Sequence, residues 1–336
     1  MPVTIKDIAK TAGVSHTTVS RALQGNPAIS AETTARIKKL AQEMGYTPSA
    51  VAQSLLSQRT YTIGMVVTTI ADPFIVQIVE GVERVAKEAG YSVFLSTSHN
   101  NPNQEIAVVD TFQRRRVDAI IVTSSRVGSV YSSQLDKIQV PIVLINNQEE
   151  GDFLHTVAVN DIQGAQLAVQ HLLDLGHSRI AYIGASNRPK SNRRRMAGYE
   201  TALKQAGIPN FPDLILTPPA DNDFERGQAA LDLLLAAGAS AVFCYNDIIA
   251  IGLLMACRQR NLCIPQQLSV VGFDDIEPAS YVTPSLTTIR QPRSKLGQLA
   301  MNMVLDLLNE QEAQDQILGC ELIVRESSVP FPVSPS

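Results

Sequence analysis

Residues 4–23 read TIKDIAKTAGVSHTTVSRAL, and this stretch decides the fold of the amino-terminal part of the chain. Thr4 and Asp7 have the spacing of a capping box, which predicts a helix that begins near residue 5 and ends at Gly13. Ser15 can cap a second helix that runs to the end of the stretch. Two short helices around a Gly-Val-Ser turn predict a helix-turn-helix unit.

A third amphipathic helix is expected from about Ala31 to Met44, followed by Gly45. The alternative interpretation of these three helices is a small cap with a purely structural role. The charge favours the first interpretation, because residues 1–60 carry a net charge of +4 whereas the other 276 residues carry −8. A basic head on an acidic body indicates that only the head meets a polyanion.

Length and composition indicate a soluble globular protein of two or three domains, since the 336 residues are 45% hydrophobic and 18% charged. No stretch approaches the roughly 20 apolar residues of a membrane helix, and the first residues lack a signal-peptide pattern. We therefore expect a cytoplasmic protein with no membrane partner. The four cysteines and the histidines form no ligand spacing, so we expect reduced, buried cysteines and no metal site.

From residue 62 onward, apolar runs alternate with helical patterns, which is typical of parallel sheets covered on both faces. The chain length suits two doubly wound lobes. Ligands bind such sheets at the carboxyl ends of the strands. The expected strands are Thr62 to Val67, Val93 to Thr97, Ala119 to Thr123, Ile142 to Ile145, Thr156 to Val159, Ile180 to Ile183, Ala241 to Cys244 and Val270 to Phe273; four of the expected helices are Phe74 to Glu88, Gln163 to Leu175, Met196 to Ala206 and Ile248 to Gln259.

Motifs of common enzyme classes are missing from the sequence. No G-x-G-x-x-G follows a strand, and neither a phosphate loop nor a G-x-S-x-G elbow occurs. Asp274 and Asp275 are adjacent, but successive strand residues point to opposite faces, which argues against a catalytic pair. We therefore expect no catalytic residues, no enzyme activity and no cofactor. A free sugar-binding protein for a transporter remains an alternative, although it would lack a signal peptide and a use for the basic head.

The chain resembles the lac-repressor (LacI/GalR) family of bacterial transcription regulators. The resemblance is carried by residues 3–23, 45–55 (GYTPSAVAQSL), 72–74 (DPF), 175–181 (LGHSRIA), 195–199 (RMAGY), 246–247 (ND), 268–275 (LSVVGFDD) and 284–289 (PSLTTI). It implies an all-α helix-turn-helix head at residues 1–48, a linker at 49–61, and an α/β body of two doubly wound parallel-sheet lobes at 62–333, similar to periplasmic binding proteins. Lobe 1 would comprise about 62–161 plus 291–319, and lobe 2 about 162–290 plus 320–333. A homodimer is implied as well.

The expected partner of the head is a palindromic operator in double-stranded DNA. In a helix-turn-helix, the first turn of the second helix meets base edges in the major groove. His16 and Thr17 are the expected base readers, and Arg21 suits guanine. Hydroxyl groups suit phosphates, although Thr18 and Ser20 have the alternative of simply facing solvent. The expected DNA-contacting residues of the head are Thr4, Ser15, His16, Thr17, Thr18, Ser20 and Arg21.

In the linker, Leu55 occupies the position where the family inserts a leucine pair into the minor groove, and Ala52 is small enough to let two linker helices approach each other. The alternative interpretation is that Leu55 or Leu56 packs on the body. We count both residues among the expected DNA-binding residues.

The expected effector site lies at the carboxyl ends of the strands, where polar groups gather around two aromatic rings. Such a lining suits a hydroxyl-rich ring, so a sugar or sugar derivative is the expected effector and a purine or nucleoside the alternative. The resemblance implies a repressor that its effector releases from DNA. Asp274 and Asn246 have the alternative of capping helices, and Phe224 of packing in the core. The expected effector-binding residues are Asp72, Phe74, Asn146, Ser191, Arg195, Phe224, Asn246 and Asp274.

Overall fold

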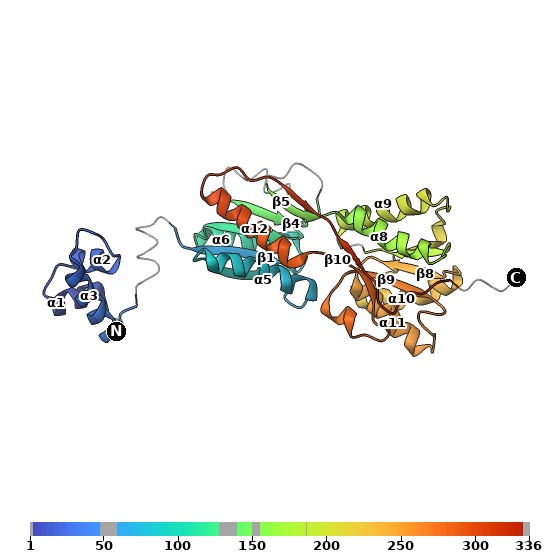
Figure 1. The fold of residues 1–336 in the computed structure, drawn as a ribbon, viewed down its shortest axis with the longest axis horizontal. Coiled ribbons are helices and arrows are strands. Elements are labelled where there is room, and N and C mark those ends of the chain that lie inside the picture. Colours follow the sequence, from blue (N-terminus) through green and yellow to red (C-terminus); the bar gives the residue numbers. More distant parts are fainter. Residues whose placement is uncertain (1–2, 48–58, 128–139, 150–154, 186, 332–336) are drawn as a thin grey trace. The chain divides into compact units, whose positions relative to one another are not determined.

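The computed structural model describes residues 3–47, 59–127, 140–149, 155–185 and 187–331. The chain divides into two compact units, Met1–Thr60 and Tyr61–Ser336, which we call the head and the body. The head is helical, and the body contains two six-stranded sheets (Figure 1). The predicted fold class is therefore confirmed: an α-helical head and an α/β body of two parallel-sheet lobes.

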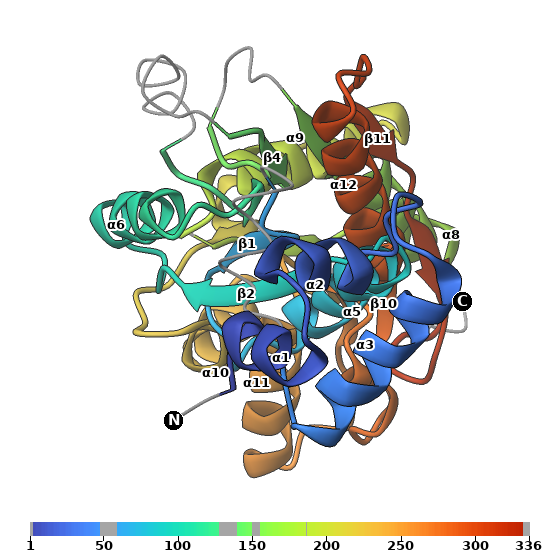
Figure 2. The same cartoon turned by 90° about the vertical axis from the view of Figure 1, so that its left-hand side faces the viewer.

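The head consists of α1 (Ile5–Ala12), α2 (His16–Leu23) and α3 (Ala31–Glu43), shown in blue in Figure 2. Both halves of the capping box between Thr4 and Asp7 are formed, and α1 ends at Gly13 with a φ of 67°. That backbone conformation favours glycine because a Cβ would be strained there. The three helices enclose a small apolar core made by Ile8, Ala9, Val19, Ala22, Ile37 and Ala41.

The first lobe is built on a sheet with the strand order β11-β5-β4-β3-β1-β2, in which all paired strands are parallel. Apolar residues of the central strands alternate between two separate cores, so helices cover both faces. The strands are β1 (Thr62–Val67), β2 (Ser92–Thr97), β3 (Ala119–Thr123), β4 (Ile142–Ile145), β5 (Thr156–Val159) and β11 (Gln316–Leu318), and the helices are α5 (Pro73–Glu88), α6 (Pro102–Arg114) and α12 (Arg293–Leu308).

The second lobe has the strand order β12-β10-β9-β8-β6-β7, in which only β12 is antiparallel to its neighbour among the described strands. Its strands are β6 (Ile180–Ile183), β7 (Ile215–Leu216), β8 (Ala241–Cys244), β9 (Ser269–Asp274), β10 (Thr287–Arg290) and β12 (Glu321–Ile323). Its helices are α8 (Asp161–Asp174), α9 (Pro189–Gln205), α10 (Asp223–Ala236) and α11 (Asp247–Gln259), with short 3-10 turns at Pro212–Leu214 and Glu277–Ser280.

Close helix packing depends on small residues. Gly227 of α10 and Gly252 of α11 face each other's backbone, because a Cβ on either would collide with the carbonyl oxygen of Ile249 or Phe224. The glycines allow the two helices to pack at short range, which fixes the start of α10 against α11.

The chain passes between the two sheets three times, after β5, after β10 and after β11. For this reason α12, which comes late in the chain, lies beside α5 of the first lobe (Figure 1). The connections bring the carboxyl ends of both sheets toward each other, and the side chains that follow the strands meet there.

The eight predicted strands are all present, with bounds that shift by at most one residue at either end. The helix predicted from Met196 begins instead at Pro189, because the polar run before Met196 hides its first two turns in the sequence. Four cysteines are free, but the expectation that all are buried is wrong for Cys263, which is exposed. Among the described residues, no helix is long and apolar enough to cross a membrane, and no group of three or more His, Cys, Asp or Glu side chains could hold a metal ion.

Candidate functional site

The exposed surface of the head is formed in part by the first turn of α2. Ser15 caps the helix, its Oγ accepting a hydrogen bond from the backbone N–H of Thr18 at 3.0 Å. His16 and Thr17 follow at the first two helical positions, and both side chains are exposed. Arg21 is exposed one turn later. The sequence thus places three polar side chains on one accessible stretch of a helix whose opposite side packs into the core through Val19 and Ala22.

The other predicted contacts of the head differ in how far their hydroxyl groups are already engaged. The Thr4 hydroxyl donates to Asp7 Oδ2 at 2.7 Å, and this hydrogen bond lowers the pKa of the Asp7 carboxyl. Thr18 Oγ1 lies 2.9 Å from Ser15 Oγ, and Thr18 and Ser20 are half-buried. Thr4 and Ser15 therefore serve first as helix caps. The predicted DNA contacts Ala52 and Leu55 lie outside the described residues.

A cavity between the lobes brings together four of the predicted effector-binding residues. We call it the first cavity; its lining contains Phe74, Asn146, Ser191 and Arg195 together with Ser124, Gln148, Asp161, Arg188, Tyr245 and Gln291. Its volume is about 10 Å³, close to the space of one water molecule, because the lining side chains fill it. A larger ligand requires these side chains or the lobes to move apart.

Arg195 is the centre of the buried charge network beside this cavity. It lies within α9 rather than at its start, and its Nε donates to Asp161 Oδ1 at 2.9 Å. Its guanidinium carbon lies 3.7 Å from the centre of the Phe273 ring and 4.4 Å from that of Tyr245. Burial alone would lower the pKa of Arg195, but the carboxylates of Asp161 and Asp274 raise it above its ordinary value. Arg195 is therefore a fixed buried cation.

Asp274 is the last residue of β9, and its carboxyl group is almost completely buried. Its Oδ1 accepts a hydrogen bond from Gln291 Nε2 at 2.6 Å and lies 3.7 Å from Arg195 Nη1. Burial raises the pKa of Asp274 to about 6, although the nearby arginines oppose the shift. Desolvation therefore destabilises the ionised carboxylate of Asp274. A ligand hydroxyl that donates a hydrogen bond to it would offset part of this desolvation penalty.

Two contacts tie the lobes together at the same place. Asp72, which caps α5 of the first lobe, accepts a hydrogen bond from Arg188 Nη2 of the second lobe at 2.9 Å. Ser191 Oγ lies 2.8 Å from the Tyr245 hydroxyl and 3.1 Å from Gln148 Oε1 of the first lobe. Polar side chains from both lobes thus pair across the cavity, and a bound ligand would compete with these pairs.

The remaining predicted residues have other partners. Asn146 follows β4, and its Oδ1 accepts from the backbone N–H of Val159 at 3.2 Å. Asn246 caps α11 and donates to Asp223 Oδ2 at 2.7 Å, so the helix cap considered as its alternative role is present. Phe224 is the half-buried second residue of α10. Four of the eight predicted residues are not among the described residues that line the first cavity, namely Asp72, Phe224, Asn246 and Asp274.

The sequence prediction missed four lining residues that contribute strongly to the site: Gln148, Arg188, Tyr245 and Gln291. Three of them follow predicted strands within a few residues, so the rule that ligands bind at strand ends would have found them. Gln291 follows β10, a strand that was not predicted.

Comparison with known proteins accounts for both units. Residues 4–49 match the family model of bacterial regulatory proteins, lacI family, and residues 169–328 match a periplasmic binding protein-like domain. The transcriptional repressor PurR of Erwinia tasmaniensis is 36% identical over 319 residues, which cover 94% of this chain and 93% of that protein. The ribose operon repressor of Escherichia coli is 35% identical and covers 96% of this chain and 98% of its own.

Solved structures agree with the sequence relatives. The crystal structure of the lac repressor dimer bound to operator and the anti-inducer ONPF is similar with a TM-score of 0.87 and 27% identity, covering 98% of this chain and 100% of that chain. With a helix-turn-helix head, a two-lobed body and full-length relatives of this kind, the chain belongs to the lacI family of bacterial regulatory proteins and is a DNA-binding transcriptional regulator.

Proposed function

We propose that this regulator is a repressor that binds a palindromic operator as a homodimer and is released by a sugar or sugar derivative bound between its lobes. The observation that carries the proposal is the polar lining of the first cavity, which both lobes supply. No catalytic step or cofactor is part of this function, and a target in chromosomal DNA implies action in the cytoplasm.

The head supports the DNA-binding part of the proposal. His16 and Thr17 are exposed on the first turn of α2, the turn that enters the major groove in helix-turn-helix proteins. We assign base reading to these two residues and to Arg21, and phosphate or positioning contacts to Thr4, Ser15, Thr18 and Ser20. In the linker we propose that Leu55 acts as a wedge in the minor groove and that Ala52 permits close pairing of two linkers.

The chemistry of the first cavity supports a hydroxyl-rich ligand. The lining combines the arginine donors Arg188 and Arg195, the carboxylate of Asp161, amide side chains that can both donate and accept, and the apolar ring of Phe74. Among the relatives is a ribose operon repressor, and a LacI-family regulator from Enterococcus faecium with 29% identity and a TM-score of 0.72 over 81% of this chain and 100% of its own has been solved with bound ribose. We therefore propose the sugar class before the nucleoside class.

Exposed apolar side chains support a dimer. Phe94 and Leu95 lie on β2, the edge strand of the first sheet, and are 48% and 39% exposed. Val76 on the neighbouring helix α5 is 49% exposed. An exposed apolar edge strand is an aggregation hazard unless another surface covers it, and a second copy of the chain is the occupant we propose.

For the domain boundaries we propose a DNA-binding domain at residues 1–48, a linker at 49–61 and an effector-binding and dimerisation domain at 62–333. Lobe 1 comprises about 62–161 plus 291–319, and lobe 2 about 162–290 plus 320–333. The assignment of the described strands to two sheets supports the division of the body.

Calorimetric titration of the full-length protein with a panel that includes ribose, cellobiose, adenosine and guanine tests the effector class. We expect one sugar to bind with a stoichiometry of one per chain, and Asp274→Ala to abolish its binding because the ligand loses a buried acceptor. Binding of adenosine or guanine without any sugar would contradict the sugar class, and unchanged sugar binding by Asp274→Ala would contradict the placement of the site.

A further inference from the structure

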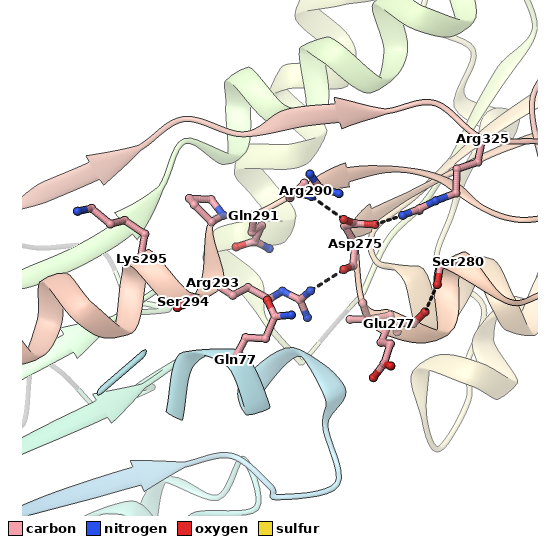
Figure 3. Close-up of a pocket in the computed structure, with 12 residues that line it drawn as sticks. Gln77, Asp275, Glu277, Ser280, Arg290, Gln291, Arg293, Ser294, Lys295 and Arg325 are labelled. Carbon is pink, nitrogen blue, oxygen red and sulfur yellow. Dashed lines mark hydrogen bonds and ion pairs between the residues drawn. The ribbon is translucent and has the colours of Figure 1, made fainter. Parts of the chain in front are cut away.

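A second cavity, of about 430 Å³, lies where the chain passes from β10 to α12 (Figure 3). Gln77 and Ser294 contribute to its lining from the first lobe, and Asp275, Arg290 and Arg325 contribute from the second. Small-molecule sites commonly have volumes of about 300–1,000 Å³. Of the described lining residues, only Gln291 is shared with the first cavity. The second cavity is therefore a separate space large enough for a small ligand.

The lining of the second cavity has a surplus of positive charge. Arg290, Arg293, Arg325 and Lys295 face only Asp275 and Glu277 among the described lining residues. Asp275 is enclosed by Arg290 Nε at 2.7 Å and Arg325 Nη2 at 2.6 Å, as Figure 3 shows. Burial would raise the pKa of Asp275, but the hydrogen bonds from Arg325 and Arg290 hold it below its ordinary value. One carboxylate is thus shared by two guanidinium groups, which leaves an excess of positive charge that can attract a further anion.

Arg293, another lining residue of this cavity, contacts both lobes and is only 5% exposed. Its Nη1 lies 3.4 Å from the carbonyl oxygen of Pro73, and its Nη2 donates to the carbonyl oxygen of Asp275. In the described structure its Nε has no hydrogen-bond partner, and neither has Oε1 of the buried Gln291. A buried polar atom without a partner has lost its hydrogen bonds to water without replacement, which is unfavourable. A ligand that accepts from Arg293 and donates to Gln291 would satisfy both atoms.

The first turn of α12 adds donors of a different kind. This 16-residue helix begins at Arg293 after Pro292, without a side-chain cap. The backbone N–H groups of a first helical turn have no partner within the helix, and together with the helix dipole they attract anions. Ser294 and Lys295 of this turn belong to the lining.

We propose that the second cavity binds a small anion with a phosphate group, held between the lobes by Arg290, Arg293 and the start of α12. Arginine matches phosphate oxygens with paired hydrogen bonds. A phosphate that keeps one proton near neutral pH also supplies the donor that Gln291 Oε1 lacks, which a carboxylate or sulfate does not. Because the contacts come from both lobes, the ligand stabilises their present arrangement.

Titration of the full-length protein with inorganic phosphate, by calorimetry at constant ionic strength with chloride as reference, tests this proposal. We expect saturable binding of one phosphate per chain at this cavity. Arg290→Gln removes a half-exposed donor and is expected to weaken binding about tenfold, the effect of one charge-assisted hydrogen bond. Lys295→Gln, at an exposed position of the same lining, provides a second variant and is expected to weaken binding several-fold.

Arg115→Gln is the matched control, because it removes the same charge from an exposed position at the end of α6. It is expected to bind phosphate like the wild type. The proposal is overturned if the wild type shows no saturable binding, if all three variants bind alike, or if sulfate binds as tightly as phosphate. Loss of binding in Arg188→Gln with full binding in Arg290→Gln would also overturn it, because phosphate would then occupy the first cavity.

Discussion

The surface of α2 and the lining of the first cavity differ in how far their polar side chains are buried. On α2, His16 and Thr17 are exposed and contribute little to folding. Around the first cavity, Arg195 and Asp274 are buried and depend on each other's charge. Under the proposed function, DNA reading would use exposed side chains, whereas effector binding would use buried charged side chains whose substitution changes the stability of the fold. Substitutions in the two regions should differ most clearly in their effect on the free energy of unfolding.

The largest expected effect follows from Arg195→Leu. This substitution leaves Asp161 and Asp274 buried without their shared cation, and breaking a buried ion pair from one side costs about 3–5 kcal/mol. Urea unfolding of the body, followed by tyrosine near-UV circular dichroism, measures the loss. Lys204→Leu, on an exposed position of the same helix, is the control and should change stability by less than about 0.5 kcal/mol. Equal effects of the two substitutions would remove the distinction between the regions.

A smaller change with the opposite sign is expected from Asp274→Asn. The pKa of Asp274 is raised by burial to about 6, so this group stabilises the fold at low pH and loses that contribution as the pH rises from about 4 to 6. A neutral amide avoids the cost, and the variant should be about 2–3 kcal/mol more stable than wild type at pH 7 and nearly equal at pH 4. Unfolding measured at both values checks this. A variant that is less stable at pH 7 would show that the carboxylate is well compensated.

Ser15→Ala should cost about 1 kcal/mol, the usual effect of losing a helix cap. Because the head is a separate unit, the effect should be confined to α1–α3 and leave the body unchanged. Amide hydrogen exchange, which resolves the two units, is the suitable measurement. Faster exchange throughout the body would contradict the independence of the head.

The smallest effect on stability is expected from His16→Ala combined with Thr17→Ala, within about 0.5 kcal/mol, since both side chains are exposed. The same double substitution should change discrimination between operator sequences by about 1–3 kcal/mol per lost base contact, with little change in binding to scrambled duplex. Competition gel shifts at fixed salt distinguish a change in operator discrimination from a change in non-specific binding. Parallel loss of specific and non-specific affinity would mean that these residues contact phosphate rather than bases.

The helices of the head and most strands of the body can be predicted from local sequence signals. The head is fixed by local signals, namely the capping box of Thr4, Gly13 and the Ser15 cap, and all three helices are found where they are expected. The eight predicted strands are equally clear: seven lie inside the sheets, where continuous apolar runs mark strands covered on both faces, and the eighth is the apolar edge strand β2. The strands that were missed, β7, β10, β11 and β12, are short or lie toward the edges of the sheets, where apolar patterns are weak.

The first cavity and the charged groups beside it are harder to predict because they are assembled from distant segments. Post-strand positions identify Asn146 and Asp274, but their partners Val159 and Gln291 are determined by the packing of neighbouring strands. Arg195 belongs to a run of three arginines from which the family resemblance singles it out, and the packing of α9 against α8 shows that it is buried. Sequence patterns thus give the edge of the sheet that carries a site, whereas charge pairing requires the fold.

Release of DNA by an effector tests the central claim most directly. A palindromic duplex selected from a random pool by the full-length protein would be labelled, and its anisotropy followed while the sugar identified by calorimetry is added to the wild type and to Asp274→Asn. We predict that both proteins bind the duplex, and that the sugar weakens binding by the wild type about 5- to 150-fold but leaves Asp274→Asn bound. Failure to select any sequence over scrambled duplex, or equal release of both proteins by the sugar, would contradict the account.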